Sequence, residues 1–313
     1  MLPIALALIE EIKTAKFLSP ESAHKFSKAL LLTVAYSASI GGLATLIGSV
    51  PNAVFAAVAA SSLDRSVSFA QWMLFALPIT IILLIVLYLL LTKWLFKIDD
   101  ADQVSSDFAK KELHNLGPMS YEEKLTGLVF LIVSVLWISS SALPASLHLS
   151  DTVIAMIGAV LLFLIPARAD KGGLLVWKDM SKLSWGILLL FGGGLSLAAA
   201  FEDSGLTKWF GGMLGIVEPL PLILIVIVLT TGILFLTEVM SNTAVSNMLM
   251  PISIGLAAAI NQDPFFIMGV VALSSTCAFM LPISTPPNAA VFSSDELDMK
   301  DMIKAGFILN IFT

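Results

Sequence analysis

The chain has 313 residues, of which 58% are hydrophobic and only 13% carry a charge. Soluble domains hold about 25% charged residues, so this composition excludes a soluble globular protein and predicts an all-α polytopic membrane protein. The net charge of −6 says little about partners. We expect the lipid bilayer, and no nucleic acid, around the chain.

Residues that enzymes use at nucleophile and metal sites are sparse. The single cysteine, Cys277, lies in an apolar stretch and cannot form an internal disulfide. The sequence holds no CxxC pair, no zinc-type spacing of His and Cys, and no GxxxxGK[ST] phosphate loop. An intramembrane enzyme would need a nucleophile with a base, or a metal cluster, at one depth. We expect no enzyme, because the histidines fall in polar connections: His24, His114 and His148.

The first third of the chain combines a helix end, a broken helix and a complete span. About 20 residues cross a hydrocarbon core, and one apolar stretch before the polar middle of the chain has this length, with Pro78 as a kink. We place these elements at Met1–Ile12, Ala29–Ile47, Ala53–Ala60 and Trp72–Thr92, with a polar connection up to about Lys28 and a break at Gly48-Ser49-Val50-Pro51-Asn52.

The middle of the chain begins with its longest polar segment, Lys93–Lys124, in which acids and lysines alternate. We interpret this segment as a solvated connection. Three spans follow, and the glycines Gly192-Gly193-Gly194 in the last of them permit close helix packing. The spans are Leu125–Leu143, Thr152–Pro166 and Trp185–Phe201.

The stretch Thr237–Ile252, TEVMSNTAVSNMLMPI, places three small polar residues inside an apolar run. In hydrocarbon such a break is tolerated only where it is buried in protein or lines a cavity. Ser, Asn and Thr also cap helix N-termini, whose N–H groups bind anions. We predict a re-entrant helical hairpin over residues 220–260 that turns at Ser241-Asn242-Thr243.

A second interruption, Leu281–Asn288, reads LPISTPPN within the apolar stretch Phe265–Phe292. Its three prolines cannot donate to a helical ladder. A further span begins at Ile303. Two broken helices close in sequence indicate the binding site of a transporter.

Basic residues give the orientation of the predicted spans. If the hairpin starts and ends on the same side of the membrane, 15 of the 17 lysines and arginines fall in one set of connections. Only Arg65 and Lys208 fall in the other set. The rich set is therefore predicted to be cytoplasmic, and the hairpin opens toward the outside.

The sequence contains an internal repeat. Leu2-Pro3-Ile4 echoes Met250-Pro251-Ile252, and Pro51-Asn52-Ala53 echoes Pro287-Asn288-Ala289. Five spans between the copies predict opposite orientations, which is the inverted-repeat transporter arrangement with substrate near the membrane midplane. We predict three parts: residues 1–97 as the end of the first repeat, 98–124 as a cytoplasmic connection, and 125–313 as the second repeat.

These motifs resemble the divalent anion:sodium symporter family, and bacterial sodium/dicarboxylate cotransporters in particular. The resemblance covers essentially the whole chain and rests on Ser241-Asn242-Thr243, on Gly48-Ser49 with Pro51-Asn52, and on Ser284-Thr285-Pro286-Pro287-Asn288. Family members carry two SNT motifs, two opposed hairpins and two unwound helices. The resemblance thus implies a fragment truncated at both ends that begins just after the first SNT motif. One departure is Ser49-Val50-Pro51, where many members have two prolines.

The resemblance also implies a set of ligands. One sodium ion would be held by the first hairpin tip, which this chain lacks, and by the loop at Gly48. A second sodium ion would be held around Thr237, Met240, Asn242 and Ser284. Substrate carboxylates would contact Ser241, Asn242, Thr243, Ser49, Thr285 and Pro286. The resemblance further implies a homodimer in the inner (plasma) membrane.

The charge distribution independently favours cation coupling. The positive residues all lie in connections, so a dianion would find no Lys or Arg at the midplane. The remaining sources of positive potential are helix N-termini and bound cations. Loops rich in Ser, Thr, Asn and carbonyl oxygens suit a hard cation such as sodium. Sodium and substrate would then favour each other's binding.

We therefore predict a secondary active symporter for sodium and a C4-dicarboxylate such as succinate, fumarate or malate, working by alternating access. A sodium-independent dicarboxylate exchanger on the same fold remains an alternative, as does a symporter for tricarboxylate or sulfate. A channel is not excluded by broken helices, although no continuous ion-lined pore is evident. Glu238 lies closest to the site among the acids, and it either relays a proton or supports the hairpin.

Overall fold

The computed structural model describes residues 1–15, 18–97, 117–140, 149–168, 172–182, 185–214 and 219–313. Throughout these ranges the regular structure is helical, and an isolated antiparallel bridge between Pro166 and Gly173 is the only strand-like pairing. Most of the predicted connection 98–124, with His114, lies outside the described residues, as does His148.

The chain divides into two compact units. The first unit comprises residues 1–67, 75–104 and 188–313, and the second comprises residues 68–74 and 105–187. Every residue predicted for the functional site belongs to the first unit. The repeat boundaries at residues 97 and 124 stay a prediction.

The second unit is built on two helices, α6 (Tyr121–Ser139) and α7 (Asp151–Leu164). Trp137 joins them, because its Nε1 donates to the carbonyl of Asp151 at 3.0 Å. The Asp151 side chain accepts the backbone N–H of Phe69 at 2.8 Å. The Phe69 ring stacks on Trp137, with the ring centroids 5.1 Å apart. The unit also holds the short 3-10 helix η5 (Trp177–Lys182).

The second helix of the first unit, α2, is long and starts earlier than the sequence predicted. Ser19 is its N-cap, with Oγ accepting the N–H of Ser22 at 3.3 Å, and Pro20 follows at a favourable first position. The predicted polar connection up to Lys28 is therefore wrong from Pro20 onward, because these residues belong to the helix. The helices of this part are α1 (Leu2–Ala15), α2 (Pro20–Leu43), α3 (Val50–Ser62) and α4 (Phe69–Leu89), and α4 continues as the π-helical turn η1 (Leu90–Leu95).

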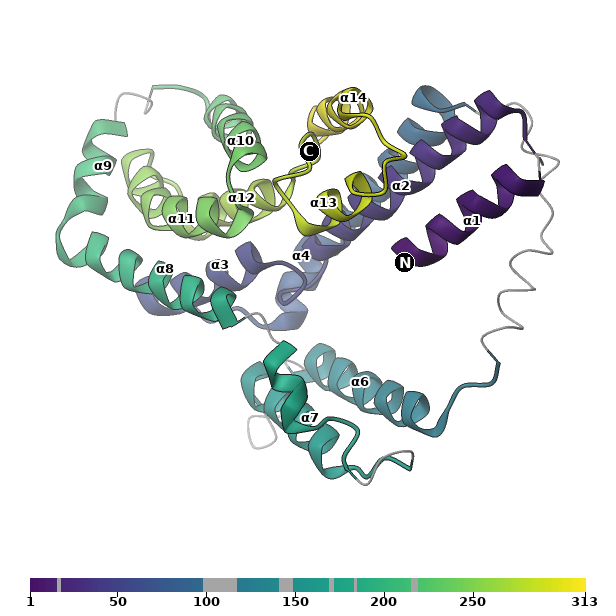
Figure 1. Ribbon diagram of the computed structural model, residues 1–313. Coiled ribbons are helices and arrows are strands. Elements are labelled where there is room, and N and C mark those ends of the chain that lie inside the picture. The colour runs from purple at the N-terminus through teal and green to yellow at the C-terminus, as the bar shows by residue number, and fades with distance from the viewer. Residues whose placement is uncertain (16–17, 98–116, 141–148, 169–171, 183–184, 215–218) are drawn as a thin grey trace. The chain divides into compact units, whose positions relative to one another are not determined.

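The rest of the first unit contains both predicted interruptions. A two-residue turn, Met240-Ser241, separates α10 from α11, and residues 277–285 separate α12 from α13. In Figure 1, α11 lies among its neighbours, and it packs against α3, α9, α10 and α12. The helices are α8 (Trp185–Asp203), α9 (Leu206–Leu214), α10 (Leu222–Val239), α11 (Asn242–Ala259), α12 (Pro264–Thr276), α13 (Pro286–Phe292) and α14 (Met299–Asn310).

Within the described residues, three helices are long and apolar enough to cross a membrane: α2, α4 with its extension to Leu95, and α10. Large apolar side chains on α10 are exposed, among them Ile223 at 67% and Val228 at 62%. Apolar surface of this extent is expected where a helix faces lipid rather than water. The helix lengths and their surfaces agree with the predicted multi-pass membrane protein.

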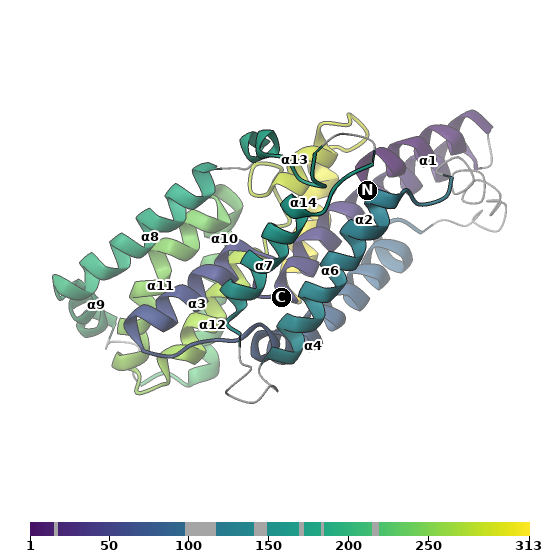
Figure 2. The ribbon, with the colours of Figure 1, turned by 90° about the horizontal axis from the view of Figure 1, so that it is seen from below.

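The core of the first unit forms where α2 meets the C-terminal elements. Tyr36 on α2 is fully buried, and its hydroxyl donates to the carbonyl of Met302 at 3.1 Å. The Tyr36 ring packs on Phe279 with the ring centroids 5.3 Å apart. α13 packs against α2, as Figures 1 and 2 show. These contacts fix the 277–285 segment against α2 and α14.

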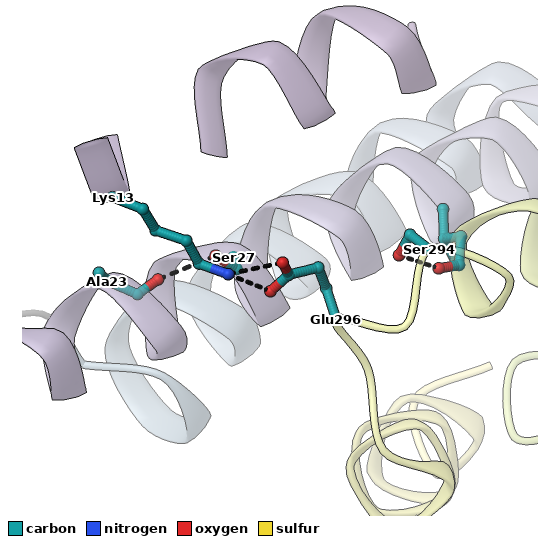
Figure 3. A network of polar contacts seen from close by, with 6 residues as sticks. Lys13, Ala23, Ser27, Ser294 and Glu296 are labelled. Carbon is teal, nitrogen blue, oxygen red and sulfur yellow. Dashed lines mark hydrogen bonds and ion pairs between the residues drawn. The ribbon is translucent and has the colours of Figure 1, made fainter. Parts of the chain in front are cut away.

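Ion pairs join the N-terminal helices to the segment after α13. Lys13 reaches both carboxylate oxygens of Glu296, as Figure 3 shows, with Nζ 2.6 Å from Oε2. Lys28 is only 9% exposed and pairs with Asp298 at 3.0 Å and with Asp301. Pairing with these two carboxylates offsets the cost of burying the Lys28 charge inside the long helix α2.

Candidate functional site

Two asparagines hold the two helix interruptions in the same way. Asn52 donates through Nδ2 to the carbonyls of Gly42 at 3.0 Å and Thr45 at 2.9 Å. Asn288 donates to the carbonyls of Ala278 and Leu281, both at 3.1 Å. In each loop the acceptors lie 10 and 7 residues before the asparagine. The two segments that the sequence paired as repeats therefore have matching hydrogen bonds.

The residue three positions before each asparagine occupies the N-cap position of the following helix. Ser49 has φ −142° and ψ 146°, and Thr285 has φ −137° and ψ 147°. Thr285 Oγ1 accepts the N–H of Asn288 at 3.4 Å. Ser49 makes a different contact, because its Oγ lies 3.0 Å from Oγ1 of Thr276 at the end of α12. The first loop is thereby tied to the second broken helix.

Gly48 needs its lack of a side chain. A Cβ at this position would lie 2.5 Å from the carbonyl oxygen of Gly42 and 2.8 Å from Oγ1 of Thr45. The backbone of the first loop therefore folds tightly on itself, while Gly48 as a residue is exposed. A predicted sodium ligand that acts through its carbonyl is compatible with this position.

Three oxygen atoms meet at the hairpin tip. Thr237 Oγ1 lies 2.8 Å from Oδ1 of Asn242 and 3.0 Å from the carbonyl oxygen of Ser275. A hydroxyl has one proton, so Thr237 can donate to only one of these two acceptors at a time. The other pair of oxygens lies close together without a shared proton. A hard cation, which prefers oxygen ligands, would stabilise this arrangement.

The end of α12 connects the hairpin to the first loop. Asn242 donates through Nδ2 to the carbonyl of Thr276 at 3.4 Å, and the Thr276 side chain contacts Ser49. The hydrogen bonds thus bring three of the predicted residues, Thr237, Asn242 and Ser49, into one network. Thr276 and Ser275 complete that network.

The other predicted residues differ in exposure. Ser284 and Thr285 are buried, at 6% and 5% exposure. Ser284 donates from Oγ to the carbonyl of Leu281 at 2.8 Å or to Glu238 at 3.1 Å. Thr243 is half-buried in the first turn of α11. Exposed positions beside the network are Met240, Ser241 and Pro286.

Glu238 is a buried carboxylate next to Thr237, with 2% of its surface exposed. Its oxygens accept three successive backbone N–H groups, from Phe279 at 2.8 Å, Met280 at 2.9 Å and Leu281 at 3.0 Å. Asn310 on α14 donates to it at 3.1 Å. Of the two roles that the sequence left open for Glu238, these contacts fit support of the hairpin and the loop.

Sequence reasoning missed Ser275, Thr276 and the two loop asparagines as parts of the site. A signal for the first two was present, because three consecutive hydroxyl residues, Ser274-Ser275-Thr276, interrupt the apolar pattern just before the LPISTPPN break. Hydroxyl residues in membrane helices often bond only to their own helix, and Ser275 does so through Oγ, which lies 2.6 Å from the carbonyl of Val271. Its role in the network instead comes from its carbonyl.

Two interrupted helices and a helix turn meet here at a cluster of oxygens, and discontinuous helices of this kind form the binding sites of many membrane transporters. Residues 1–313 match the family described as the sodium:sulfate symporter transmembrane region. The chain therefore belongs to this family, the divalent anion:sodium symporters that its motifs resemble.

Among similar proteins are sodium-dependent dicarboxylate transporters named SdcS. The one from Staphylococcus saprophyticus is 40% identical and the one from Staphylococcus aureus is 38% identical, each over the whole of this chain. The chain spans 62% of the length of these relatives. The family and these relatives are transporters rather than enzymes.

Proposed function

We propose that the complete protein is a sodium-coupled symporter of C4-dicarboxylates such as succinate, fumarate and malate, working by alternating access. The observation that carries the proposal is the oxygen cluster of Thr237, Asn242 and Ser275, which shares a single hydroxyl proton. The cluster lies beside a helix turn within an apolar stretch of the chain. The names of the relatives, sodium-dependent dicarboxylate transporters, agree with both co-substrates.

The proposed sodium sites combine this geometry with the family resemblance. Thr237 and Asn242 supply side-chain oxygens, while the resemblance adds Met240 and Ser284 as sources of backbone or hydroxyl oxygens. Gly48 belongs to a separate ion site in the first loop, to which an upstream hairpin would contribute. Coupling arises because each bound cation adds positive charge beside the anion site, and linkage makes the effect reciprocal.

The proposed substrate site is next to these ions. Neutral side chains and helix N-termini would bind the carboxylates, since hydroxyls and carboxamides donate to anions without a permanent charge. Ser49 and Asn242 already share the Thr276 connection. The residues proposed to contact the substrate are Ser241, Asn242, Thr243, Ser49, Thr285 and Pro286.

The membrane arrangement is part of the proposal. The α10–α11 pair is a re-entrant hairpin, and the matching loops at Asn52 and Asn288 belong to inverted repeats. The equal spacing of their hydrogen bonds supports a repeated unit. A homodimer in the plasma membrane completes the proposed assembly.

Sulfate is a second candidate substrate, because the matching family is described by sodium:sulfate symport. Sulfate and a C4-dicarboxylate are both dianions, and a site of neutral donors accepts either charge. The distance between the two negative groups of the substrate separates these candidates, so direct competition between sulfate and succinate is informative.

Uptake of labelled succinate by proteoliposomes tests the proposal, with the complete gene product and an inward sodium gradient. Choline replaces sodium in the control. Uptake that requires sodium and is not reduced by excess sulfate is the expected result. Uptake without sodium that requires internal dicarboxylate would identify an exchanger instead, and sodium-driven uptake of sulfate alone would identify a sulfate symporter.

The assignment of Asn242 to the site is the one that mutation can test most directly. The variant Asn242→Ala loses an oxygen of the cation cluster and the donor to Thr276, so it should abolish sodium-driven succinate uptake at unchanged expression. Uptake at the wild-type rate would remove Asn242 from the site. The half-exposed hydroxyl of Ser37, which bonds weakly within α2, offers a control variant, Ser37→Ala.

A further inference from the structure

Glu238 accepts hydrogen bonds from two elements beyond its own helix. Three consecutive N–H groups of the 277–285 loop point at its carboxylate, within 2.8–3.0 Å. Ser284 of the same loop lies 3.1 Å away, and Asn310 of α14 donates at 3.1 Å. A Cβ at Gly306 would lie 2.5 Å from the Phe279 carbonyl, which shows how closely α14 approaches this loop.

The hydrogen-bond partners of Glu238 are suited to a carboxylate. Backbone N–H groups and a carboxamide NH2 can only donate, which is the surrounding of an ionised carboxylate. All five partners are neutral, so their dipoles stabilise the charge without cancelling it. Three of the five partners, the backbone N–H groups, can only donate, whereas the side chains of Ser284 and Asn310 each also carry an acceptor oxygen.

In the sequence, Glu238 is the next residue after Thr237, which belongs to the oxygen cluster. Thr237 precedes Glu238 at the end of α10, and the Thr237 hydroxyl contacts Asn242 and Ser275. A unit charge acts strongly on a nearby cation where little water screens it. The field of Glu238 therefore favours a cation over an anion at the Thr237 oxygens.

Glu238 also fixes the shape of the loop. Its oxygens attract the N–H groups of residues 279–281, while Asn288 binds the carbonyls of Ala278 and Leu281 from another direction. The loop is therefore held both through its N–H groups and through its carbonyl groups. Ser284, a proposed sodium ligand, follows directly from this doubly anchored segment.

The first loop lacks such an anchor among the described residues. Gly48 precedes Asn52 by the same interval that separates Ser284 from Asn288, and close contact between Gly42 and Gly48 tightens this loop. Although the two loops share their asparagine contacts, a buried carboxylate is found at the second loop alone within the described part of the chain. The contribution of Glu238 can therefore be distinguished from that of the asparagine contacts that both loops share.

We propose that Glu238 is a positioning residue that holds the 277–285 loop and supplies the negative charge that sets sodium affinity at the Thr237–Asn242 oxygens. This inference rests on the proposed sodium coupling. It assigns Glu238 no direct contact with substrate. Its loss should therefore weaken sodium binding while leaving substrate affinity at saturating sodium almost unchanged.

The test measures sodium dependence in two ways on the complete gene product. Succinate uptake into proteoliposomes gives the sodium concentration for half-maximal rate and the KM for succinate at saturating sodium. The rise in melting temperature on adding sodium chloride in detergent, with choline chloride as reference, reports sodium binding without transport. For Glu238→Gln we expect at least a tenfold higher half-maximal sodium concentration, a succinate KM within about twofold of wild type, and a smaller sodium-induced rise in melting temperature.

A second variant keeps the test decisive if Glu238→Gln does not fold. Asn310→Leu removes one donor to the carboxylate and keeps its charge, so it should shift sodium dependence in the same direction by a smaller factor. Glu202→Gln, an exposed acid on α8, is the matched control and should behave as wild type. Sodium dependence unchanged in both Glu238→Gln and Asn310→Leu would overturn the proposal, as would equal loss of sodium and succinate affinity.

The thermal measurement separates this inference from the proposed function. A wild-type protein that is stabilised by sodium but takes up no succinate would refute dicarboxylate transport and still report on Glu238 through the melting temperatures. A wild-type protein without any sodium response would overturn both statements.

Discussion

Asn52 and Asn288 occupy equivalent places in two loops, and each donates to the carbonyls 10 and 7 residues before it. Both side chains are fully buried. Each replaces the helical hydrogen bonds that the broken helix gives up, because the carbonyls at a helix end need donors once the chain leaves the helix. The same solution in both loops explains how an apolar helix can be interrupted inside a membrane protein.

The first prediction compares two substitutions of Asn288. Asn288→Ala leaves the buried carbonyl of Ala278 without its donor and removes one of the two donors to Leu281, which Ser284 Oγ also contacts, so it should cost about 1–3 kcal/mol of stability. Asn288→Asp has nearly the same shape but turns an oxygen toward the same carbonyls, so it should lower the melting temperature in detergent further than alanine does. An aspartate variant as stable as wild type would show that Asn288 does not donate to the loop.

Gly48 allows a steric prediction with a close control. Gly48→Ala would bring a methyl group to 2.5 Å from the Gly42 carbonyl, so the loop must open, and sodium-driven uptake should fall strongly. Gly41→Ala meets no atom within 4 Å and should leave uptake and melting temperature near the wild-type values. Equal behaviour of the two variants would mean that the loop does not pack as tightly as the Gly42–Gly48 contact requires.

Two substitutions of Thr237 distinguish the contribution of its hydroxyl group from that of its side-chain shape. Thr237→Val keeps the branched shape but removes the oxygen shared with Asn242 and Ser275, so the half-maximal sodium concentration for uptake should rise about tenfold or more, at about 1.4 kcal/mol for each factor of ten. Thr237→Ser retains the oxygen and should stay close to wild type. A valine variant with normal sodium dependence would place the cation elsewhere.

The interruptions of the helices could be predicted from sequence because their signals are local. Proline and small polar residues inside apolar runs marked the turn before Asn242 and the break before Asn288, and the structure has helix ends at both places. The first break was placed too late, since α2 ends at Leu43 rather than at Ile47. No proline or charged residue marks that end in the sequence. The donors to the carbonyls of Gly42 and Thr45 come from the side chain of Asn52, further along the chain.

The contacts that assemble the site were beyond sequence reasoning because they join distant segments. Ser49 and Thr276 are separated by 227 positions, and neither stands out from the many hydroxyls of the chain. Lys28 was assigned to the end of a polar connection, whereas it lies inside α2. Its partners, Asp298 and Asp301, lie near the other end of the sequence.

Lys28 and Lys13 allow a comparison between a buried and an exposed ion pair. The side chain of Lys28 is 11% exposed, whereas that of Lys13 is 42% exposed. Exposed pairs contribute little, while removing one member of a buried pair leaves a charge without compensation. Lys28→Met should therefore lower the melting temperature clearly, and Lys13→Met should change it only slightly. Equal effects would argue against burial of the Lys28 pair.

The Arg65–Asp263 contact predicts how stability depends on pH. Two hydrogen bonds from Arg65, at 2.9 and 2.8 Å, hold the pKa of Asp263 below its usual value, and the N–H of Phe265 at the start of α12 adds to this effect. A lowered pKa in the folded state contributes stability that is present above the unfolded pKa of about 3.9 and is lost as the pH falls through the folded value. The effect should be small because both side chains are half exposed.

Asp263→Asn tests this assignment, because asparagine still caps α12 but carries no charge. Melting temperatures in detergent between pH 6 and pH 3 should fall less steeply for this variant than for wild type, with the two curves converging at the acidic end. Arg65→Gln should reproduce the flatter curve, since it removes the same hydrogen bonds from the other side. The exposed acid Asp203 on α8 gives the control, and Asp203→Asn should retain the wild-type slope. A wild-type slope for Asp263→Asn as well would show that the acid loss of stability arises at other carboxylates.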